Sequence, residues 1–207
     1  MCETSENLRT FKQEDSIDNF QLHEFSRNPK YAIFRLTNET TPLPLLKTTD
    51  VTVSTLHHNP YTVVLRFNNK KEVKSIEDTD DFMVSLIEKH SEALLGECFT
   101  KKELLDEHVF IPSLSQNLLK TFGLNRETNN LSNFPSFHVY EPSKCTISSE
   151  RLIQDVICRC ALDPWYIQVF TKTRRLRVLW FIKQCMIMEE PLNTNYILDA
   201  DDEEEQS

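Results

Sequence analysis

The chain has 207 residues, of which 39% are hydrophobic, and its formal net charge of −9 at pH 7 argues against a generally basic nucleic-acid coat protein. It contains only two glycines, where an average content of about 7% would give roughly fourteen. Loops that cradle phosphates need glycine for positive φ angles and for close backbone approach, so this composition argues against a P-loop, a dinucleotide fold and a Gly-x-Ser-x-Gly esterase.

No membrane or export signal is recognisable in the sequence. The longest apolar runs, such as residues 178–182, are far shorter than the roughly twenty residues of a membrane span, and the polar residues 1–19 lack the apolar stretch of a signal peptide. We therefore expect an intracellular protein with no membrane contact, the nucleus being slightly favoured over the cytoplasm. The six cysteines are expected to be free thiols, several of them acting as small hydrophobic residues.

Residues 28–98 have the pattern of a small sheet covered by a helix. Apolar or alternating runs predict four mostly antiparallel strands, at residues 31–36, 50–56, 61–67 and 71–76. An amphipathic stripe predicts a helix at residues 79–95, which ends at Gly96. Residues 1–27, which precede this unit, are expected to be flexible.

Residues 99–190 are predicted to form a mainly helical C-terminal domain. Capping patterns predict helices from Thr100 to about residue 110 and at residues 113–122, where Gly123 ends the second helix. Apolar residues at helical spacing predict a further helix at 149–162. Residues 165–188 leave two alternatives open, a hairpin after that helix or one long helix beginning at Pro164.

The expected fold class is therefore α+β, a small antiparallel sheet packed by an amphipathic helix and followed by a mainly helical half. With a hairpin at 165–188, that half would have the element order of a winged-helix module. The last nine residues contain six acidic side chains. Because such a run repels itself and buries nothing, residues 191–207 are predicted to be a disordered acidic tail.

The sharpest local feature is a basic cluster flanked by aromatic residues between positions 165 and 181. The candidate site residues are Trp165, Tyr166, Phe170, Lys172, Arg174, Arg175, Arg177, Trp180 and Phe181. The aromatic residues could be core beside a solvated basic face, or the region could bind a protein, since Trp, Tyr and Arg are enriched at interface centres. A third interpretation is contact with nucleic acid, because cations attract phosphates and aromatic rings stack on bases.

No metal, cofactor or catalytic site is predicted. Candidate metal ligands are Cys145, Cys158, Cys160, Cys185 and His138, but Cys158 and Cys160 lie in the helix predicted at 149–162, where a one-residue spacing would turn the two thiols apart. The chain has no His-Glu-x-x-His motif and no cysteine in a recognisable catalytic signature.

The main functional prediction is a non-enzymatic interaction subunit or adaptor of an intracellular multiprotein complex, with one or more protein partners bound by the 165–181 region. The alternative is a nucleic-acid-associated protein that uses the same region, with the acidic tail from Asp199 competing for the basic cluster as a phosphate mimic. An enzyme with an unfamiliar cysteine-based site is the third class considered.

Overall fold

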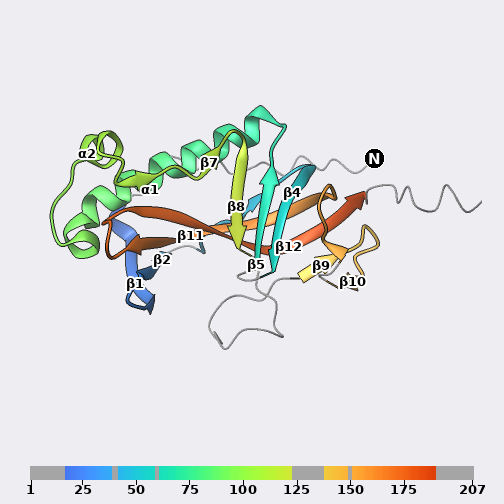
Figure 1. The fold of residues 1–207 in the computed structure, drawn as a ribbon, viewed down its shortest axis with the longest axis horizontal. Coiled ribbons are helices and arrows are strands. Elements are labelled where there is room, and N and C mark those ends of the chain that lie inside the picture. The colour runs from blue at the N-terminus through green and yellow to red at the C-terminus, as the bar shows by residue number, and fades with distance from the viewer. Residues whose placement is uncertain (1–16, 39–41, 59–60, 123–137, 149–150, 190–207) are drawn as a thin grey trace, which may run out of the picture.

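A computed structural model describes residues 17–38, 42–58, 61–122, 138–148 and 151–189, and these residues form a mainly β protein with one long helix (Figure 1). After the 3-10 turn Ile17–Asn19, the first elements are β1 Phe20–Arg27, β2 Tyr31–Asn38, β3 Leu46–Lys47, β4 Val51–His58, β5 Tyr61–Arg66, α1 Lys70–Leu95 and α2 Lys101–Asp106. The later elements are β6 Phe110–Ile111, β7 Leu114–Ser115, β8 Leu118–Phe122, β9 His138–Tyr140, β10 Thr146–Ile147, β11 Ile157–Phe170 and β12 Leu176–Glu189.

Five of the strands close into a barrel. Around the barrel the order is β4, β5, β8, β12 and β11, and β11 pairs again with β4 to complete the circle. The pairs β4–β5, β5–β8, β11–β12 and β11–β4 are antiparallel, and β8–β12 is parallel. If the five barrel strands are numbered one to five in chain order, their order around the barrel is one, two, three, five, four.

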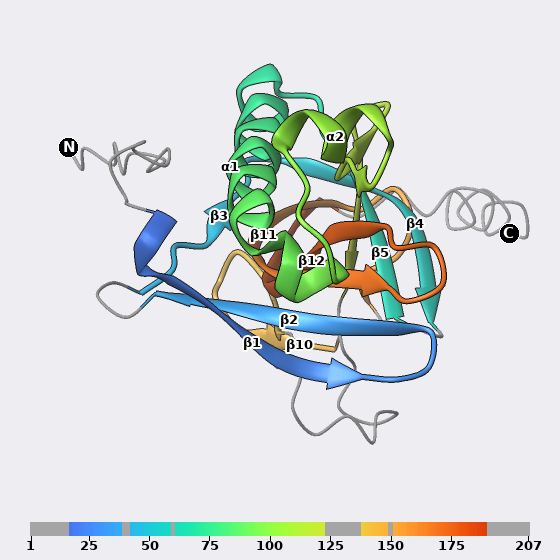
Figure 2. The ribbon, with the colours of Figure 1, turned by 90° about the vertical axis from the view of Figure 1, so that its left-hand side faces the viewer.

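The two longest strands, β11 and β12, extend beyond the barrel and carry further strands. Residues 166–170 of β11 pair with β2, which in turn pairs with β1. The β9 strand pairs with the other end of β12 and with β10. In Figure 2, α1 and α2 lie on one side of β11 and β12, and the β1–β2 hairpin lies on the other.

The α1 helix packs its apolar stripe onto the barrel core. The side chain of Asn69 caps its N-terminus by accepting a hydrogen bond from the Lys71 amide, and Gly96 ends it with φ of 81°. Ile76, Met83 and Ile87 are fully buried in the main core cluster. The same core is filled from the barrel side by alternate residues of the strands, so the helix closes one side of the barrel.

Several predicted elements are confirmed in the N-terminal half. Strands occupy the regions predicted at 31–36, 50–56 and 61–67, and the helix that ends at Gly96 is present. The capping box of Thr100 and Glu103 opens α2 as expected. Residues 71–76 form the start of α1 rather than a strand, because Asn69 caps the helix directly after β5.

The predicted α+β fold with a mainly helical C-terminal half is wrong. Residues 113–122 form β7 and β8 joined by a tight turn, and residues 157–162 are the first part of β11. The hairpin alternative for 165–188 is correct, but the helices that a winged-helix module needs before it are strands. The apolar spacing favoured the wrong element here. Val156 and Cys160 are both buried and four positions apart, a spacing that puts two residues on one face of a helix and also on one face of a strand.

Other predictions concern residues outside the described part of the chain, namely most of the flexible segment 1–27, Gly123 as a helix end and the acidic tail 191–207. The division at residue 98 stays a prediction, and strands from both sides of it, such as β2 and β11, pair in one sheet. Neither of the described helices is both long and apolar enough to cross a membrane.

Candidate functional site

The β11–β12 hairpin presents two different faces. Because successive side chains of a strand point to opposite sides, Trp165 and Ile167 lie in the main core while Tyr166 and Gln168 lie on the outer face. On β12 the same alternation places Trp180 in the main core and Phe181 outside. The outer face is opposite the one that α1 covers.

Aromatic side chains from four strands form a continuous row across this outer face. The row consists of Phe25 on β1, Tyr166 on β11, Phe181 on β12 and Phe122 on β8. The ring centroids are 5.5 Å apart for Phe25 and Tyr166, 4.7 Å for Tyr166 and Phe181, and 6.0 Å for Phe181 and Phe122. Tyr166 and Phe181 in the middle are buried, whereas Phe25 and Phe122 at the ends are half-buried. We call these four residues the aromatic row.

Three cations lie over the rings of this face. The guanidinium of Arg35 on β2 is 5.7 Å from the ring centroid of Tyr166. The guanidinium of Arg177 is 5.6 Å from the centroid of Phe122, and the ammonium of Lys120 is 5.9 Å from the same centroid. Within the described part of the chain, none of the three has a carboxylate partner. Among the described residues, the row therefore combines ring faces with positive charge that has no carboxylate partner.

Arg177 is the most constrained of these cations. Its Nε donates a hydrogen bond of 2.9 Å to Oε1 of Gln168, and its guanidinium also lies 5.4 Å from the ring of Phe170. Burial lowers the pKa of Arg177 from its ordinary value, and burial also raises the pKa of Tyr166. A fixed, partly desolvated guanidinium gains more from a bound anion than one fully surrounded by water does.

A surface pocket lies next to the aromatic row, where β5, β8 and β12 meet. Its wall includes Val64, Leu118, Lys120, Phe122 and Arg177. The pocket thus combines the apolar side chains of Val64 and Leu118 with the ring of Phe122 and the cations of Lys120 and Arg177. Such a lining suits a flat ring with a negative charge next to it.

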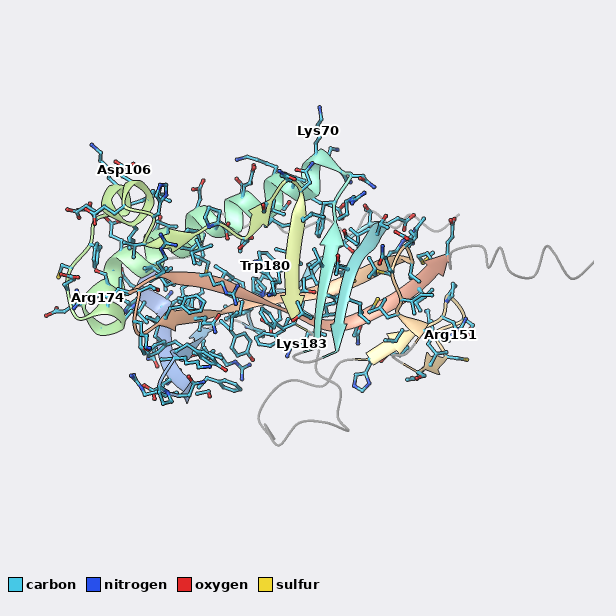
Figure 3. All side chains as sticks on the ribbon, viewed as in Figure 1. Lys70, Asp106, Arg151, Arg174, Trp180 and Lys183 are labelled. Carbon is cyan, nitrogen blue, oxygen red and sulfur yellow. The ribbon has the colours of Figure 1, made fainter. Side chains whose placement is uncertain are left out.

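The structure separates the residues of the sequence-predicted site. Trp165 and Trp180 belong to the main core, with exposed fractions of 3% and 1%. The indole Nε1 of Trp165 donates to the Pro44 carbonyl at 2.8 Å, and that of Trp180 donates to Oγ of Ser113 at 2.8 Å. Figure 3 shows Trp180 in the middle of the molecule. Neither indole is available to a partner.

The basic residues between β11 and β12 lie at the tip of the hairpin. Lys172, Arg174 and Arg175 are exposed there, and Arg174 forms an ion pair of 2.5 Å with Glu97 (Figure 3). They lie at one end of the outer face, beyond Phe170. Of the nine predicted site residues, Tyr166, Phe170, Arg177 and Phe181 therefore belong to the outer face, and the three basic tip residues extend it.

Sequence reasoning missed Phe25, Arg35, Lys120 and Phe122. They lie on β1, β2 and β8, and only the strand pairing brings them beside β11 and β12. A signal was present in the alternation of Leu119 and Thr121 with Lys120 and Phe122, which is typical of a strand with one buried face. The helix predicted at 113–122 concealed it.

The expectation that no metal binds rested on a helix around Cys158 and Cys160. These residues lie in β11, where a one-residue spacing puts both thiols on the same face, together with Cys185 of β12. Cys145 is exposed outside this group, and His138 on β9 is not part of it.

No protein-family model matches the chain, and no curated protein matches it in sequence. Among solved structures, it is similar to the single-stranded DNA-binding protein from bacteriophage Enc34 in complex with ssDNA, with a TM-score of 0.43 and 12% identity over 83% of this chain and 97% of that one. A C-terminal truncation of the same phage protein gives a TM-score of 0.41 and 11% identity over 83% of this chain and 96% of that one. At these identities the similarity concerns the fold alone.

The prediction of an adaptor that binds protein partners through the 165–181 region is wrong. The two indoles that were expected to anchor such a partner are in the core.

Proposed function

We propose that the protein binds single-stranded DNA along the aromatic row. The observation that carries the proposal is the row itself, four neighbouring rings across the outer face, with Arg35, Lys120 and Arg177 lying over them. Rings supply stacking surfaces for bases, and cations supply partners for phosphates.

The physical reason for preferring a single strand is the accessibility of base faces. In a duplex the bases are stacked on one another, whereas in a single strand each base can stack on a protein ring, which contributes about 1–3 kcal/mol per base. The rings of Phe25 and Phe122 are half-buried, and the buried rings of Tyr166 and Phe181 lie between them. The three cations are spaced along the same face, where a backbone would pass.

The barrel order agrees with this position of the site. Five-stranded OB barrels bind oligonucleotides on the face of their second and third strands and at the loop between the fourth and fifth. The corresponding parts of this chain are β5, β8 and the β11–β12 turn, which carry Lys120, Phe122 and the basic tip residues Lys172, Arg174 and Arg175. This is an analogy of fold and supports the location of the site, not its ligand.

The proposal is tested by fluorescence anisotropy with a labelled oligo(dT) and two charge-reversal variants. Lys120→Glu changes an exposed cation on the aromatic row, and Lys102→Glu makes the same change on an exposed cation of α2, on the other side of the molecule. We expect Lys120→Glu to weaken binding about tenfold or more and Lys102→Glu to leave it nearly unchanged.

Two outcomes would contradict the proposal. One is no saturable binding of oligo(dT) by the folded protein at low salt, and the other is an equal effect of the two variants. Oligo(rU) and a DNA duplex serve as further probes. If the duplex binds as tightly as oligo(dT), base stacking on the rings does not contribute to binding. A DNA ligand also fits the expected intracellular location, which stays a prediction.

A further inference from the structure

Three buried thiols converge in the barrel wall, away from the aromatic row. Cys158 and Cys160 are separated by one residue on β11, so both point to the same side of the sheet. Cys185 on β12 is paired directly with Cys160 in the antiparallel register. The three residues therefore occupy adjacent positions on one face of two neighbouring strands.

The thiols are close enough to share one ion. The Sγ atoms of Cys158 and Cys160 are 3.7 Å apart, those of Cys160 and Cys185 are 3.8 Å apart, and all three lie within 4.8 Å of one another. An ion at the centre of a triangle with such edges would lie roughly 2.2–2.4 Å from each sulfur, which brackets the zinc–thiolate bond length of about 2.3 Å.

The surroundings fix the position of the thiols and exclude water. The exposed fractions of Cys158, Cys160 and Cys185 are 0%, 4% and 0%. The Cys160 amide donates a hydrogen bond of 2.8 Å to Oγ1 of Thr48, and the Cys160 carbonyl accepts one of 2.8 Å from the Thr48 amide. Both backbone groups of the central cysteine are thus tied to the segment between β3 and β4.

The donor set indicates the chemical class of ion. In the described part of the chain, no histidine, aspartate or glutamate oxygen or nitrogen joins the three sulfurs. Soft thiolate ligands select Cu(I), Zn(II) and iron–sulfur clusters over hard ions such as magnesium and calcium. Packing alone would be satisfied by any small apolar side chains at these three positions, and it gives no reason for three thiols to meet.

We propose that Cys158, Cys160 and Cys185 form a closed three-thiolate site for one cuprous ion, a soft ion that thiolate ligands select. Zinc, which takes four ligands in structural sites, is the comparison ion. Binding converts three thiols into thiolates and releases three protons to the solvent, so that the ion replaces the protons in the cluster. The ion would link β11 to β12 and stabilise the hairpin that carries the aromatic row. The site is independent of the proposed DNA binding.

The test begins with the full chain, refolded without oxygen and with a thiol-free reductant in the presence of zinc or of a cuprous salt. Native mass spectrometry then counts the ions bound per chain. We expect one ion in the wild type and in the controls Cys98→Ala and Cys145→Ala, which remove exposed thiols. We expect none in Cys160→Ala. A competition between the two ions should leave the cuprous ion bound.

A second measurement needs no variant, in case Cys160→Ala does not fold. The refolded wild type is alkylated at a denaturant concentration that opens the metal-free protein, and the labelled cysteines are located by peptide mapping. The ion should protect Cys158, Cys160 and Cys185 but leave Cys98 and Cys145 reactive. The proposal is overturned if the wild type retains no cuprous ion, if a bound ion survives in Cys160→Ala, or if alkylation of the three cysteines is unaffected by metal.

Discussion

Asp80 is a largely buried carboxylate that links α1 to the barrel. Its two oxygens accept hydrogen bonds from the amide of Ser113 at 2.7 Å and from the hydroxyl of Ser113 at 2.5 Å. The same hydroxyl accepts a hydrogen bond from Nε1 of Trp180. Burial raises the pKa of Asp80 from 3.8 to about 6, against the lowering effect of the two Ser113 hydrogen bonds.

This raised pKa predicts a stability that falls as the pH rises. Between the unfolded value near 4 and the folded value near 6, the folded state binds the extra proton, so the free energy of unfolding decreases through this range and is constant above it. A difference of roughly two pKa units corresponds to about 3 kcal/mol. Asp80→Asn should remove this contribution, because the amide is neutral at every pH.

The prediction is checked by urea unfolding of the wild type and Asp80→Asn between pH 4.5 and pH 7. The wild type should lose stability relative to the variant as the pH rises. The exposed neighbour Asp81 supplies the control, since Asp81→Asn removes a charge from the same turn of α1 without changing a buried group. Parallel pH profiles for all three proteins would contradict the assignment to Asp80.

Phe122 at the end of the aromatic row provides the second prediction at this scale. If a base stacks on its half-buried ring, Phe122→Ala should weaken oligo(dT) binding by roughly 5-fold to 150-fold, which is the equivalent of 1–3 kcal/mol. Phe99 is a half-buried phenylalanine between α1 and α2, so Phe99→Ala is the matched control for lost packing. Anisotropy titrations of the two folded variants measure both affinities. An equal loss of affinity in the two variants would exclude stacking at Phe122.

At the scale of the elements, the tight turn between β7 and β8 shows how this chain makes a hairpin turn without glycine. Gln116 and Asn117 have φ angles of 51° and 61°, and they connect the paired residues Ser115 and Leu118. Two central residues with positive φ define a type I′ hairpin turn, for which Asn-Gly is the preferred sequence. Six non-glycine residues of the described chain adopt positive φ, so turns are present where the sequence shows no glycine.

Restoring the preferred turn sequence should stabilise this hairpin. In the double variant Gln116→Asn, Asn117→Gly, the strain of a non-glycine residue in the left-handed region is reduced, and we expect a gain of up to about 1 kcal/mol. The amide of Phe67 donates to the carbonyl of residue 117, a backbone contact that the change preserves. Thermal unfolding measures the gain. Ser115→Gly, one position earlier in β7, should destabilise, and a loss of stability in the turn variant would contradict the turn type.

The elements that could be predicted from the sequence are those whose apolar residues fit either the helical period or the alternation of a strand, but not both. The alternation in residues 50–56 and the stripe of α1 each fit one structure, and both were confirmed. In residues 149–162 the apolar positions fit two periods at once, and only the pairing of β11 with β12 and β4 decides between them. The pairing of β11 with β4 joins segments about a hundred residues apart, which local spacing does not encode.

At the scale of the whole molecule, the two faces of the β11–β12 hairpin divide the predicted site. Composition pointed to the 165–181 segment, because aromatic and basic residues concentrate in it, and four of its predicted site residues lie on the outer face. Composition could not tell that Trp180 lies in the core and Phe181 on the outer face. Both are aromatic, and they differ only in the side of the strand to which their side chains point. The contribution of Phe25, Arg35 and Lys120 depends entirely on the order of strands in the sheet.

The distribution of charge over the whole protein leads to the last prediction. The chain carries a net charge of −9, so we expect a DNA strand to be repelled at long range and to be attracted at the three outer-face cations Arg35, Lys120 and Arg177, next to the basic tip of the hairpin. If each of the three cations displaces one counterion from a phosphate, the logarithm of the affinity should fall with the logarithm of salt concentration at a slope of roughly −2. Lys120→Ala should reduce the steepness by about 0.7, and Lys102→Ala on α2 should not change it. Oligo(dT) titrations over a series of salt concentrations give the three slopes directly. A wild-type slope near zero would show that phosphates do not contact this face, and an equal change in both variants would show that net charge alone controls binding.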